Sequence, residues 1–584
     1  MFETIGRYEK TGKISLKKRK NPEWEPCQVC DGRDAILFTG EIYNLGDLKS
    51  DLQIGGESID APEILLRYFK KYGIDRLLSK LNGIFAIAIF ASADTALYLI
   101  RDHTGIYPLY YFEQPEWILF SSEVKMFLEN GVSARLSYEG VFSYLANQSA
   151  QEPFTLIDGI KALGPGELLK YSDRGIDIKA YWNPADCTLS RSKQYDSFDA
   201  AGKNLCDLLH KAISVRKNSG HRTGILLSGG IDSSAIVAIS RLLNNNEEIH
   251  TFTVTHDNPA FDEREFARLV AKKNKTIEHE LHISNEMIGQ CIFEALETAD
   301  QPSVDGVNTY FSSKLIKENG FDSVVSGLGG EFFVEDDATA FLRIKKKYNY
   351  LSHIPSIAAT MIDNHTDNKR IRYASMLIKS EDAFFAYLRL LSDGQIKRIV
   401  ARDVYNKHKD KLDSWHKIAY KHLVREAAKL PDEIAKKYFY ESRTWHVSTL
   451  LKDVMQNSIK QGVMPQFPLM DYRLIEYLFN LPISAKADYK TSKVHLVNAA
   501  EGNIPAECVY RKKLGFVFPF FEYFKVSMRS EMERFFLGGY LSEFFDKDNL
   551  KRVWKSFLEG EENWAVIWKL FVLDRWITNN HIIL

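Results

Sequence analysis

Gly224-Ile-Leu-Leu-Ser-Gly-Gly-Ile-Asp232-Ser-Ser-Ala-Ile-Val-Ala-Ile239 is the stretch that decides the fold of the second half of this chain. It reads as an apolar strand, a glycine-rich turn and the start of a helix, and parallel sheets are built from units of this kind. Glycines let a backbone approach a phosphate closely, while the free N–H groups and the dipole at a helix start favour an anion. The stretch therefore predicts a phosphate-binding loop on a parallel sheet.

Asp232 is the most informative residue of this turn. A carboxylate inside an anion cradle would be repelled by phosphate unless a cation lay between them, so Asp232 predicts a Mg²⁺ ligand. The turn lacks the Gly-Lys-Ser/Thr ending of a Walker A loop, which separates it from kinases and GTPases. The alternative is a Gly-Gly turn followed by an Asp-Ser-Ser helix cap.

The pattern of apolar residues changes between about residues 185 and 200. Residues 35 to about 180 are short apolar runs broken by Gly, Pro, Asn and Asp, which predicts a strand-rich region with helices near 61–72 and 137–147. We therefore expect one domain over residues 1–190 and another over 200–584, the latter a parallel sheet with crossover helices and a large helical extension. In the second domain, helices are expected over 198–217, from Ser233 and over 262–273, and strands over 224–228, 250–254 and 323–327.

Charge and cysteine content narrow the class of partner. Lys and Arg total 76 and Asp and Glu total 77, so no net field favours nucleic acid or an anionic membrane over a small molecule or a peptide. Six cysteines are too thinly spread for a disulfide framework and the first residues hold no apolar signal segment, which predicts a cytoplasmic protein. The most apolar runs, such as 81–91, are shorter than the roughly 20 residues that cross a bilayer, so no membrane span is expected.

The segment Ser228-Gly-Gly-Ile-Asp-Ser-Ser234 resembles the pyrophosphate loop of the asparagine synthetase B family, a branch of the N-type ATP pyrophosphatases. The resemblance implies an α/β and α+β multidomain fold. Its N-terminal domain would be an Ntn-hydrolase-like antiparallel β-sandwich, the glutaminase domain, and its C-terminal domain an ATP pyrophosphatase of the adenine nucleotide alpha hydrolase type. Further matches follow in the family's order at Phe38–Asn44, Leu81–Ile87, Arg101–Tyr110, His250–Val254, Asp300–Tyr310, Ser326–Gly330, Pro468–Arg473 and Arg511–Phe516.

The resemblance also implies which residues bind ATP and Mg²⁺. In the family the adenine lies against backbone at two strand ends, and two carboxylates hold the metal beside the pyrophosphate. Asp232 corresponds to the first carboxylate. The second is an Asp in the family and is Glu331 here, one methylene longer; because Mg²⁺ demands near-octahedral geometry, the alternative is an acid at a helix N-terminus. The ATP-binding residues implied are Leu226, Leu227, Ser228, Gly229, Gly230, Asp232, Ser233, Ser234, Val254, Ser326, Gly327, Gly329 and Gly330.

Lys513 corresponds to the family lysine that faces the reacting phosphate and the tetrahedral intermediate, so the resemblance implies a catalytic role. A fixed cation would stabilise the charge that develops when pyrophosphate leaves and when the amine attacks. The alternative is a solvated residue in the basic run Arg511-Lys-Lys513.

The N-terminal domain departs from active relatives at its catalytic positions. Active relatives have Cys after the initiator Met, whose thiolate and free amine serve as nucleophile and base, whereas this chain has Phe2. Thr39 replaces the glutamine-binding Asn, and Ala61 replaces the Asp that grips the glutamine amine. Glu41 is retained, and beside Thr39 we expect it to be structural. The resemblance thus implies a degenerate, inactive glutaminase domain.

Two further patterns are weak candidates for metal or redox chemistry. Cys27-x-x-Cys30 has no second pair to complete a zinc site. His279 and His282 fall in a strand-like stretch, where residues three apart point to opposite faces of a sheet, which disfavours a shared metal.

Changes near the acceptor region bear on the substrate. Inactive-glutaminase relatives such as beta-lactam synthetase, carbapenam synthetase and the lasso-peptide cyclases close a ring through an acyl-adenylate. Beta-lactam synthetase has a catalytic Tyr where this chain has Leu328, so its Tyr-Glu dyad does not carry over. Met464 and Gln466 replace an acid and an arginine of asparagine synthetases, which argues against aspartate because a small dianion needs cationic partners. Asp453 is the candidate that orients or deprotonates the amine; the alternative is a helix-capping or ion-paired Asp.

These residues predict an ATP-dependent, AMP- and pyrophosphate-forming ligase that joins a small-molecule or peptide carboxylate to an amine in natural-product biosynthesis, with intramolecular ring closure as one form. The alternatives are an asparagine synthetase that uses free ammonia and a nucleotide-binding pseudoenzyme. The sequence is compatible with a homodimer and with a companion protein that delivers the substrate.

Overall fold

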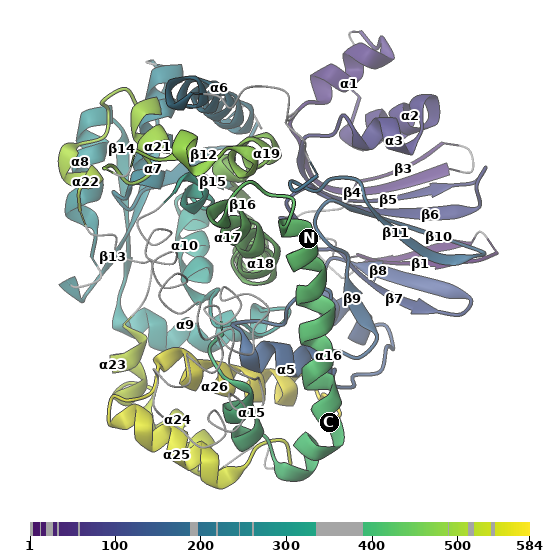
Figure 1. The fold of residues 1–584 in the computed structure, drawn as a ribbon, viewed down its shortest axis with the longest axis vertical. Coiled ribbons are helices and arrows are strands. Elements are labelled where there is room, and N and C mark those ends of the chain that lie inside the picture. The colour runs from purple at the N-terminus through teal and green to yellow at the C-terminus, as the bar shows by residue number, and fades with distance from the viewer. Residues whose placement is uncertain are drawn as a thin grey trace.

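A computed structural model describes residues 4–11, 13–18, 27–31, 34–55, 59–186, 197–217, 220–244, 246–259, 262–334, 389–488, 490–511, 519–538 and 543–584. Figure 1 shows the antiparallel sheets of the N-terminal domain on one side and the parallel sheet of the C-terminal domain, with its helices, on the other.

The N-terminal domain consists of two antiparallel sheets and a layer of helices. The smaller sheet has the strand order β2-β1-β8-β7-β9, and the larger has the order β11-β10-β6-β5-β4-β3. The strands are β1 (Thr4–Glu9), β2 (Ile14–Lys18), β3 (Cys27–Asp31), β4 (Asp34–Ile42), β5 (Gly83–Ala91), β6 (Ala96–Arg101), β7 (Tyr110–Gln114), β8 (Trp117–Ser121), β9 (Ile160–Ala162), β10 (Glu167–Ser172) and β11 (Gly175–Ala180). The helices are α1 (Leu45–Leu52), α2 (Ala61–Tyr72), α3 (Ile74–Leu78), α4 (Val124–Leu128) and α5 (Tyr138–Ala146).

Strand β5 explains why the larger sheet is covered on both faces. Its sequence GIFAIAIFA is apolar at nearly every position, and residues along a strand alternate between the two faces. Ile84, Ala86, Ala88 and Phe90 join the core between the sheets. The alternate residues 85, 87, 89 and 91 join a second core with α1, α2 and α3.

The C-terminal domain is built on a parallel sheet of five strands in the order β14-β13-β12-β15-β16. Its connections are helical, because parallel neighbours need a crossover from one end of the sheet to the other. The elements are α6 (Phe198–Lys217), β12 (Thr223–Leu226), α7 (Ile231–Leu243), β13 (His250–His256), α8 (Arg264–Asn274), β14 (Ile277–Ile283), α9 (Asn285–Thr298), α10 (Val307–Glu318), β15 (Ser323–Val325), η2 (Gly330–Phe333) and β16 (Met464–Gln466).

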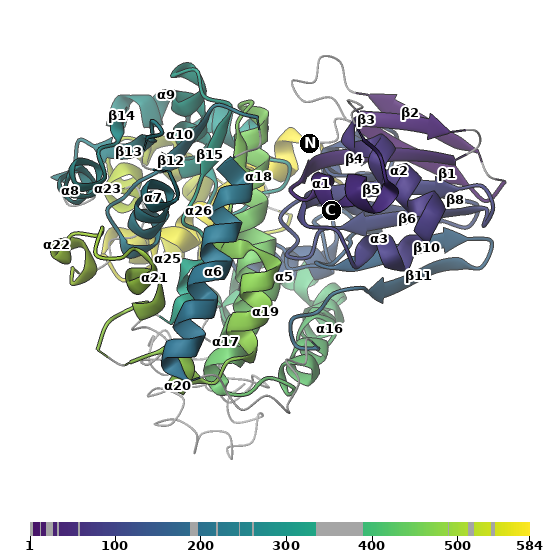
Figure 2. The ribbon, with the colours of Figure 1, turned by 90° about the horizontal axis from the view of Figure 1, so that it is seen from above.

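Helices make up most of the remaining chain. Figure 2, seen from above, places α17, α18 and α19 between the parallel sheet and the N-terminal domain. The elements are α15 (Asp393–Ile399), α16 (Arg402–Ala427), α17 (Glu433–Glu441), η4 (Ser442–Leu450), α18 (Leu451–Lys460), η5 (Pro468–Met470), α19 (Tyr472–Asn480), α20 (Ile483–Lys486), α21 (Val494–Ala499), α22 (Ala506–Val509), α23 (Phe520–Lys525), α24 (Arg529–Glu533), η6 (Arg534–Gly538), α25 (Lys547–Leu558) and α26 (Trp564–Asn579).

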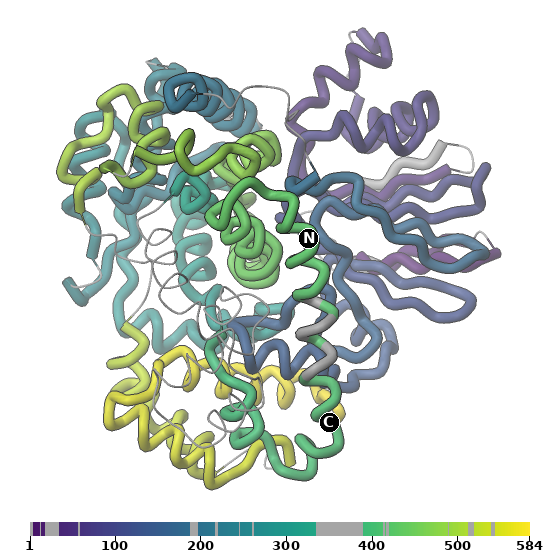
Figure 3. The backbone as a smooth tube through the Cα atoms, viewed as in Figure 1, coloured from purple at the N-terminus to yellow at the C-terminus, as the bar shows by residue number. Residues whose placement is uncertain are grey.

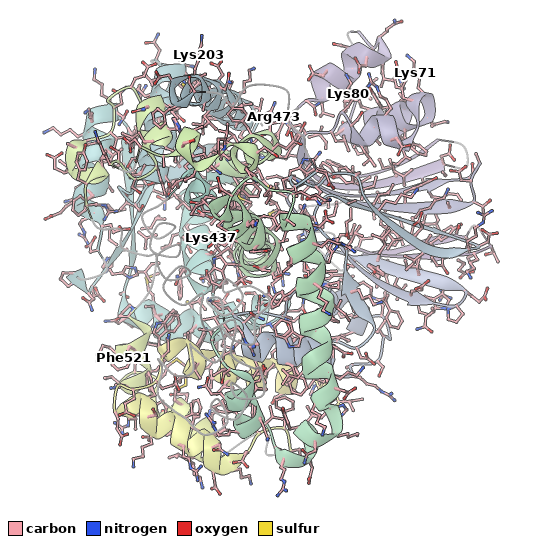
Figure 4. All side chains as sticks on the ribbon, viewed as in Figure 1. Lys71, Lys80, Lys203, Lys437, Arg473 and Phe521 are labelled. Carbon is pink, nitrogen blue, oxygen red and sulfur yellow. The ribbon has the colours of Figure 1, made fainter. Side chains whose placement is uncertain are left out.

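Polar contacts hold the two domains together. Arg216 of α6 stacks on the ring of Tyr43, 4.4 Å from its centroid, and pairs with Asp471 at 3.0 Å. Arg473 pairs with the same Asp471, and Figure 4 places Arg473 where the C-terminal domain borders the N-terminal domain. The end of the chain, marked C in Figure 3, also contacts the N-terminal domain, because the backbone N–H of Ile583 donates to the carbonyl of Ala134.

The predicted fold class is confirmed: an antiparallel sandwich precedes a parallel sheet with a helical extension. Helix α6 covers the predicted range of 198–217. Helix α7, however, begins at Ile231 rather than at Ser233, because the extended backbone of Gly230 already ends the turn and caps the helix. Within the described residues, no helix combines the length and the apolar character needed to cross a membrane.

Candidate active site at the carboxyl edge of the parallel sheet

The predicted phosphate loop joins β12 to α7 in a tightly folded turn. Gly229 has a φ of 71°, and a Cβ there would lie 2.6 Å from the carbonyl carbon of Phe266, so only glycine fits. The N–H of Ser228 donates to the Ser233 hydroxyl at 3.2 Å, and the N–H of Gly230 donates to the Ser228 hydroxyl at 3.3 Å. The side chain of Ser233 therefore holds the turn closed from inside the first turn of α7.

The residues expected beside the adenine lie at the ends of two neighbouring strands. Leu226 is paired with Phe252 across β12 and β13, and the N–H of Leu227 continues this pairing by donating to the Phe252 carbonyl at 2.8 Å. The Thr253 hydroxyl donates to the Leu227 carbonyl at 2.9 Å. Val254 follows on β13 and is half-buried, so Leu226, Leu227 and Val254 all lie at this edge of the sheet.

A second glycine-rich turn, after β15, packs against Asp232. A Cβ on Gly327 would lie 3.1 Å from the Asp232 Cβ, and a Cβ on Gly330 would lie 2.1 Å from Asp232 Oδ1. Gly329 has a φ of 99° and approaches the backbone of Leu469. The structure thus brings together the two glycine-rich turns that the sequence placed 100 residues apart, because parallel β12 and β15 end at the same edge of the sheet.

Lys493 is a residue of this site that sequence reasoning missed. Its ammonium lies 2.5 Å and 2.7 Å from the two carboxylate oxygens of Asp232, and its side chain is only 4% exposed. Lys493 caps α21 with a φ of 52°, an uncommon backbone conformation for lysine. In this structure the carboxylate of Asp232 is paired with an ammonium group from 261 residues further along the chain, and its predicted role as a Mg²⁺ ligand stays a prediction.

Glu331, the second predicted metal ligand, lies at the start of η2 and pairs with His446. His446 belongs to η4, a π-helical turn between α17 and α18, and such turns are frequent at functional sites. Burial favours the neutral acid, but the His446 charge and hydrogen bond, with the Lys493 charge, outweigh it and lower the pKa of Glu331 to about 2. Burial of His446 lowers its pKa, but the charge and hydrogen bond of Glu331 act against this effect, and the pKa of His446 is raised above its usual value.

These residues fit a nucleotide bound with a divalent cation. Asp232 pairs with Lys493, and Gly330, the residue before Glu331, packs against Asp232, so the turns that carry the two acids meet beside the phosphate loop. Mg²⁺ in phosphate sites is held by one or two carboxylates together with substrate oxygens and water, and needs no larger protein cage. The described residues offer no cluster of three or more metal-ligating side chains. The close approach of Gly330 to Asp232 also leaves no room for a side chain in the cradle.

The predicted catalytic lysine, Lys513, lies outside the described residues. Arg511, two residues before it, does contact the phosphate loop: its guanidinium donates to the Ser228 carbonyl at 3.2 Å and pairs with Glu263 at 2.5 Å. The same guanidinium stacks on Phe266 at 4.6 Å. Arg511 is therefore anchored to the phosphate loop.

Asp453, the predicted group near the amine, lies on α18 and is almost fully buried. The hydroxyl of Ser303 donates to its carboxylate. Burial raises the pKa of Asp453 to about 7; the Lys452 charge opposes this shift, and the Asp305 charge adds to it. Asp453 faces a cavity lined by Ser303 and Asp305, and no residue of the phosphate loop lines that cavity.

Residues at the former glutaminase site, both altered and retained, contact other residues of the protein. The Thr39 hydroxyl donates to the Tyr107 hydroxyl at 2.9 Å, and Ala61 begins α2. The Gln466 amide donates to Glu41 at 2.7 Å, and His221 lies 3.1 Å from the same carboxylate. Phe2 lies outside the described residues.

The remaining candidate metal pairs lie on two strands. Cys27 and Cys30 fall on β3, paired with β4. On β14, His279 contacts His250 at 3.0 Å, whereas His282 contacts Thr255 at 3.1 Å, so the two histidines have separate surroundings.

The fold and the site together define a ligase of the ATP-pyrophosphatase type joined to an amidotransferase-type domain. The family described as asparagine synthase matches residues 204–578, and the glutamine amidotransferase domain matches residues 14–182. The chain belongs to the asparagine synthase family, and it is an ATP-dependent carbon–nitrogen ligase.

Similar proteins span most of the chain. Asparagine synthetase [glutamine-hydrolyzing] 3 of Bacillus subtilis is 27% identical over 82% of this chain and 74% of its own length. Asparagine synthetase [glutamine-hydrolyzing] 1 of the same organism is 24% identical over 95% of this chain and 87% of its own. The Mus musculus asparagine synthetase [glutamine-hydrolyzing] is 30% identical over 51% of this chain and 53% of its own.

Proposed function

We propose that this chain is an AMP- and pyrophosphate-forming amide ligase of natural-product biosynthesis whose glutaminase domain is inactive. The proposal is carried by one contrast: Asp232 and Glu331 converge beside a phosphate loop, while Phe2, Thr39 and Ala61 stand at the glutaminase positions. A chain that cannot release ammonia from glutamine must take its amine from solution or from the substrate itself, and ring closure within one substrate is the second route.

Asp232 and Glu331 would hold Mg²⁺ beside the ATP phosphates, and the bound ion would neutralise charge on the departing pyrophosphate. The N–H groups at the start of α7 face the same anion and add the helix dipole. Leu226, Leu227 and Val254 present strand ends to the adenine. Each group is held by secondary structure, so little reorganisation is needed when charge develops.

Lys513 and Asp453 are proposed to act on the acyl side of the reaction. Lys513 would place an ammonium against the negative charge of the tetrahedral intermediate. Asp453 would orient the amine or accept a proton from it at its carboxylate, a task that suits a pKa of about 7 near neutral pH. Lys493 keeps Asp232 oriented toward the cradle.

The direct test uses hydroxylamine as a small general amine. The purified chain is incubated with Mg²⁺, ATP, hydroxylamine and a panel of amino acids, keto acids and dicarboxylic acids, and hydroxamate, AMP and pyrophosphate are measured together. We expect at least one acid to give all three products in equal amounts. ATP-to-pyrophosphate exchange without amine should identify the same acid. The proposal fails if ADP and phosphate are formed instead, or if no acid supports exchange while calorimetry shows that ATP binds.

A second candidate function is asparagine synthesis from free ammonia, because the most similar proteins reported above are named asparagine synthetases. Incubation with aspartate, ammonium, ATP and Mg²⁺, followed by amino-acid analysis, decides between the two. Met464 and Gln466 favour the first candidate, since they remove charges that would recognise aspartate.

A further inference from the structure

A cavity of about 570 Å³ is lined almost wholly by the C-terminal domain, and no residue of the phosphate loop lines it. Ligand sites for small molecules commonly have volumes of about 300–1,000 Å³. Its walls come from the end of α9, the segment before α10, α18 and α26, and Lys125 of the N-terminal domain also lines it. Nothing in the ATP chemistry described above uses this space.

One wall of the cavity carries two carboxylates. Asp453 is 3% exposed, and its carboxylate accepts a hydrogen bond from Ser303. Asp305 also lines the cavity, and its negative charge acts on Asp453. Gly306 brings the two chain segments together, since a Cβ there would lie 3.4 Å from the Asp453 Cβ. Two neighbouring acids whose charges repel each other are stabilised in their ionised form by a cation bound beside them.

Another wall carries a guanidinium group. Arg575 of α26 stacks on the rings of Phe293 and Phe571, with 4.7 Å and 5.8 Å from its central carbon to the ring centroids. Among the residues that the structure describes, Arg575 makes no hydrogen bond and no ion pair. A guanidinium has five N–H donors and binds carboxylates in a two-point arrangement. The stacking aromatic rings fix its plane and leave those donors for a ligand.

The cavity lies at the same edge of the sheet as the phosphate loop. Helix α10 precedes β15 and helix α18 precedes β16, and both strands run parallel to β12. A helix that leads back into a parallel strand starts at the carboxyl edge of the sheet. The first turns of α10 and α18, which carry the segment at Gly306 and Asp453, therefore lie on the edge where the phosphate loop begins.

We propose that this cavity is the acceptor pocket of the ligase, and that it binds an amine that also carries a carboxylate, as an α-amino acid does. The ammonium group lies against Asp453 and Asp305, and the carboxylate lies against Arg575. Free ammonia would use only the acidic wall and would leave the guanidinium without an anion. The inference rests on the proposed ligase function and adds the chemical class of its amine.

The test measures binding, so it does not require the acid substrate. Saturation-transfer NMR on the full chain with pools of the twenty proteinogenic amino acids is expected to reveal at least one binder. For that amino acid, the decarboxylated amine and the deaminated acid should each bind at least about 10-fold more weakly, because each loses one charge-assisted contact. Equal binding of the amine alone would overturn the role of Arg575.

Two substitutions test whether the amino acid binds in this cavity. Arg575→Gln and Asp453→Asn are each expected to weaken binding about 10-fold. Arg552→Gln, at an exposed arginine of α25, is the matched control and should leave the affinity unchanged. Asp453 is buried, so that variant can fail to fold; Arg575→Gln, at a partly exposed position, keeps the inference open to disproof.

The outcomes separate this inference from the proposed function. If ATP binds the wild-type chain and Asp232→Asn abolishes that binding, while no amino acid binds or Arg575→Gln leaves binding unchanged, the acceptor pocket is disproved and the ligase proposal stands. If ATP does not bind but an amino acid does, and Arg575→Gln weakens it, the pocket stands and the proposed function fails.

Discussion

Residues 38–44 of the N-terminal domain and residues 228–234 of the C-terminal domain both resemble motifs of the family. Their polar side chains nevertheless make different kinds of contact. In the first, the protein itself occupies the side chains: Thr39 donates to Tyr107, and Glu41 accepts from Gln466. In the second, the hydroxyls close a turn around glycine, and Asp232 faces Lys493 with 18% of its side chain exposed. Thr39 and Glu41 thus contact uncharged groups across strands and domains, whereas the partner of Asp232 is an ammonium, and an acid neutralised in this way can still accept an anionic ligand beside it.

Asp232→Asn should break this comparison most strongly. If Asp232 binds the metal as proposed, its loss is expected to lower hydroxamate formation by about 10²-fold or more, whereas Thr39→Val in the N-terminal segment should change it by less than about twofold. The assay with hydroxylamine measures both.

A stability control belongs with this variant. Asp232→Asn removes the carboxylate that pairs with the buried ammonium of Lys493, which lowers stability. The double variant Asp232→Asn/Lys493→Gln should recover thermal stability without recovering turnover. Recovery of both would show that Asp232 is only an ion-pair partner.

Gly330→Ala tests the cradle without changing any charge. The new Cβ would lie 2.1 Å from Asp232 Oδ1 and must push that carboxylate away. We expect ATP affinity, measured by calorimetry with Mg²⁺, to fall about 10-fold or more, in line with displacement of a metal ligand. Gly46→Ala in α1 is the matched control, because no atom lies within 4 Å of its Cβ. Equal affinity in both variants would contradict the assigned cradle.

The Glu331–His446 pair should stabilise the fold most at intermediate pH and less at both lower and higher pH. The pKa of Glu331 is lowered to about 2 from 4.5, so its contribution is complete above pH 4.5 and is lost as the pH falls toward 2. The pKa of His446 is raised from 6.5, so its contribution is complete below pH 6.5 and is lost at higher pH.

Unfolding midpoints of wild type and Glu331→Gln, measured in urea from pH 3 to pH 8, check this prediction. The difference should be on the order of 1–3 kcal/mol and largest between pH 4.5 and 6.5. A difference that stays constant across this range would mean that the pair does not carry the charges assigned to it.

Tyr43→Phe should have the smallest effect. It removes a hydroxyl that donates to Gln466 at 2.6 Å across the domain boundary, at an expected cost of about 0.5–1.5 kcal/mol. Thermal unfolding should move to a lower temperature, with turnover nearly unchanged. Tyr72→Phe, at an exposed tyrosine that bonds to the Asp51 carbonyl, should cost less. A loss of turnover in Tyr43→Phe alone would show that the N-terminal segment also acts on the ligase site.

Elements with strong local periodicity were predictable from the sequence. Helix α6 covers the expected 198–217, and the strand at β12 is followed by the expected turn and helix. The glycines of the turn after β12 were predicted from the local pattern, whereas those of the turn after β15 came from the resemblance to the family. The start of α7 was misplaced by two residues, since glycine is a weak signal for a helix cap.

The partners of the site's acids could not be predicted in the same way. Lys493 stands in an ordinary polar stretch, and its sequence carries no sign that the left-handed backbone of a helix cap aims it at Asp232. His446 reaches Glu331 from a π-helical turn, which no periodicity of apolar residues indicates. Both contacts depend on how whole helices pack.

By itself, the sequence determined the two kinds of sheet and the glycine-rich turn that carries Asp232 into a helix, since strand alternation, glycine and helix-start chemistry act over a few neighbouring residues. Only the tertiary structure decided that Lys493 pairs with Asp232, that His446 pairs with Glu331, and that Asp453 and Arg575 line one cavity. These are contacts between distant segments, and their geometry is set by packing of the whole molecule rather than by any local pattern.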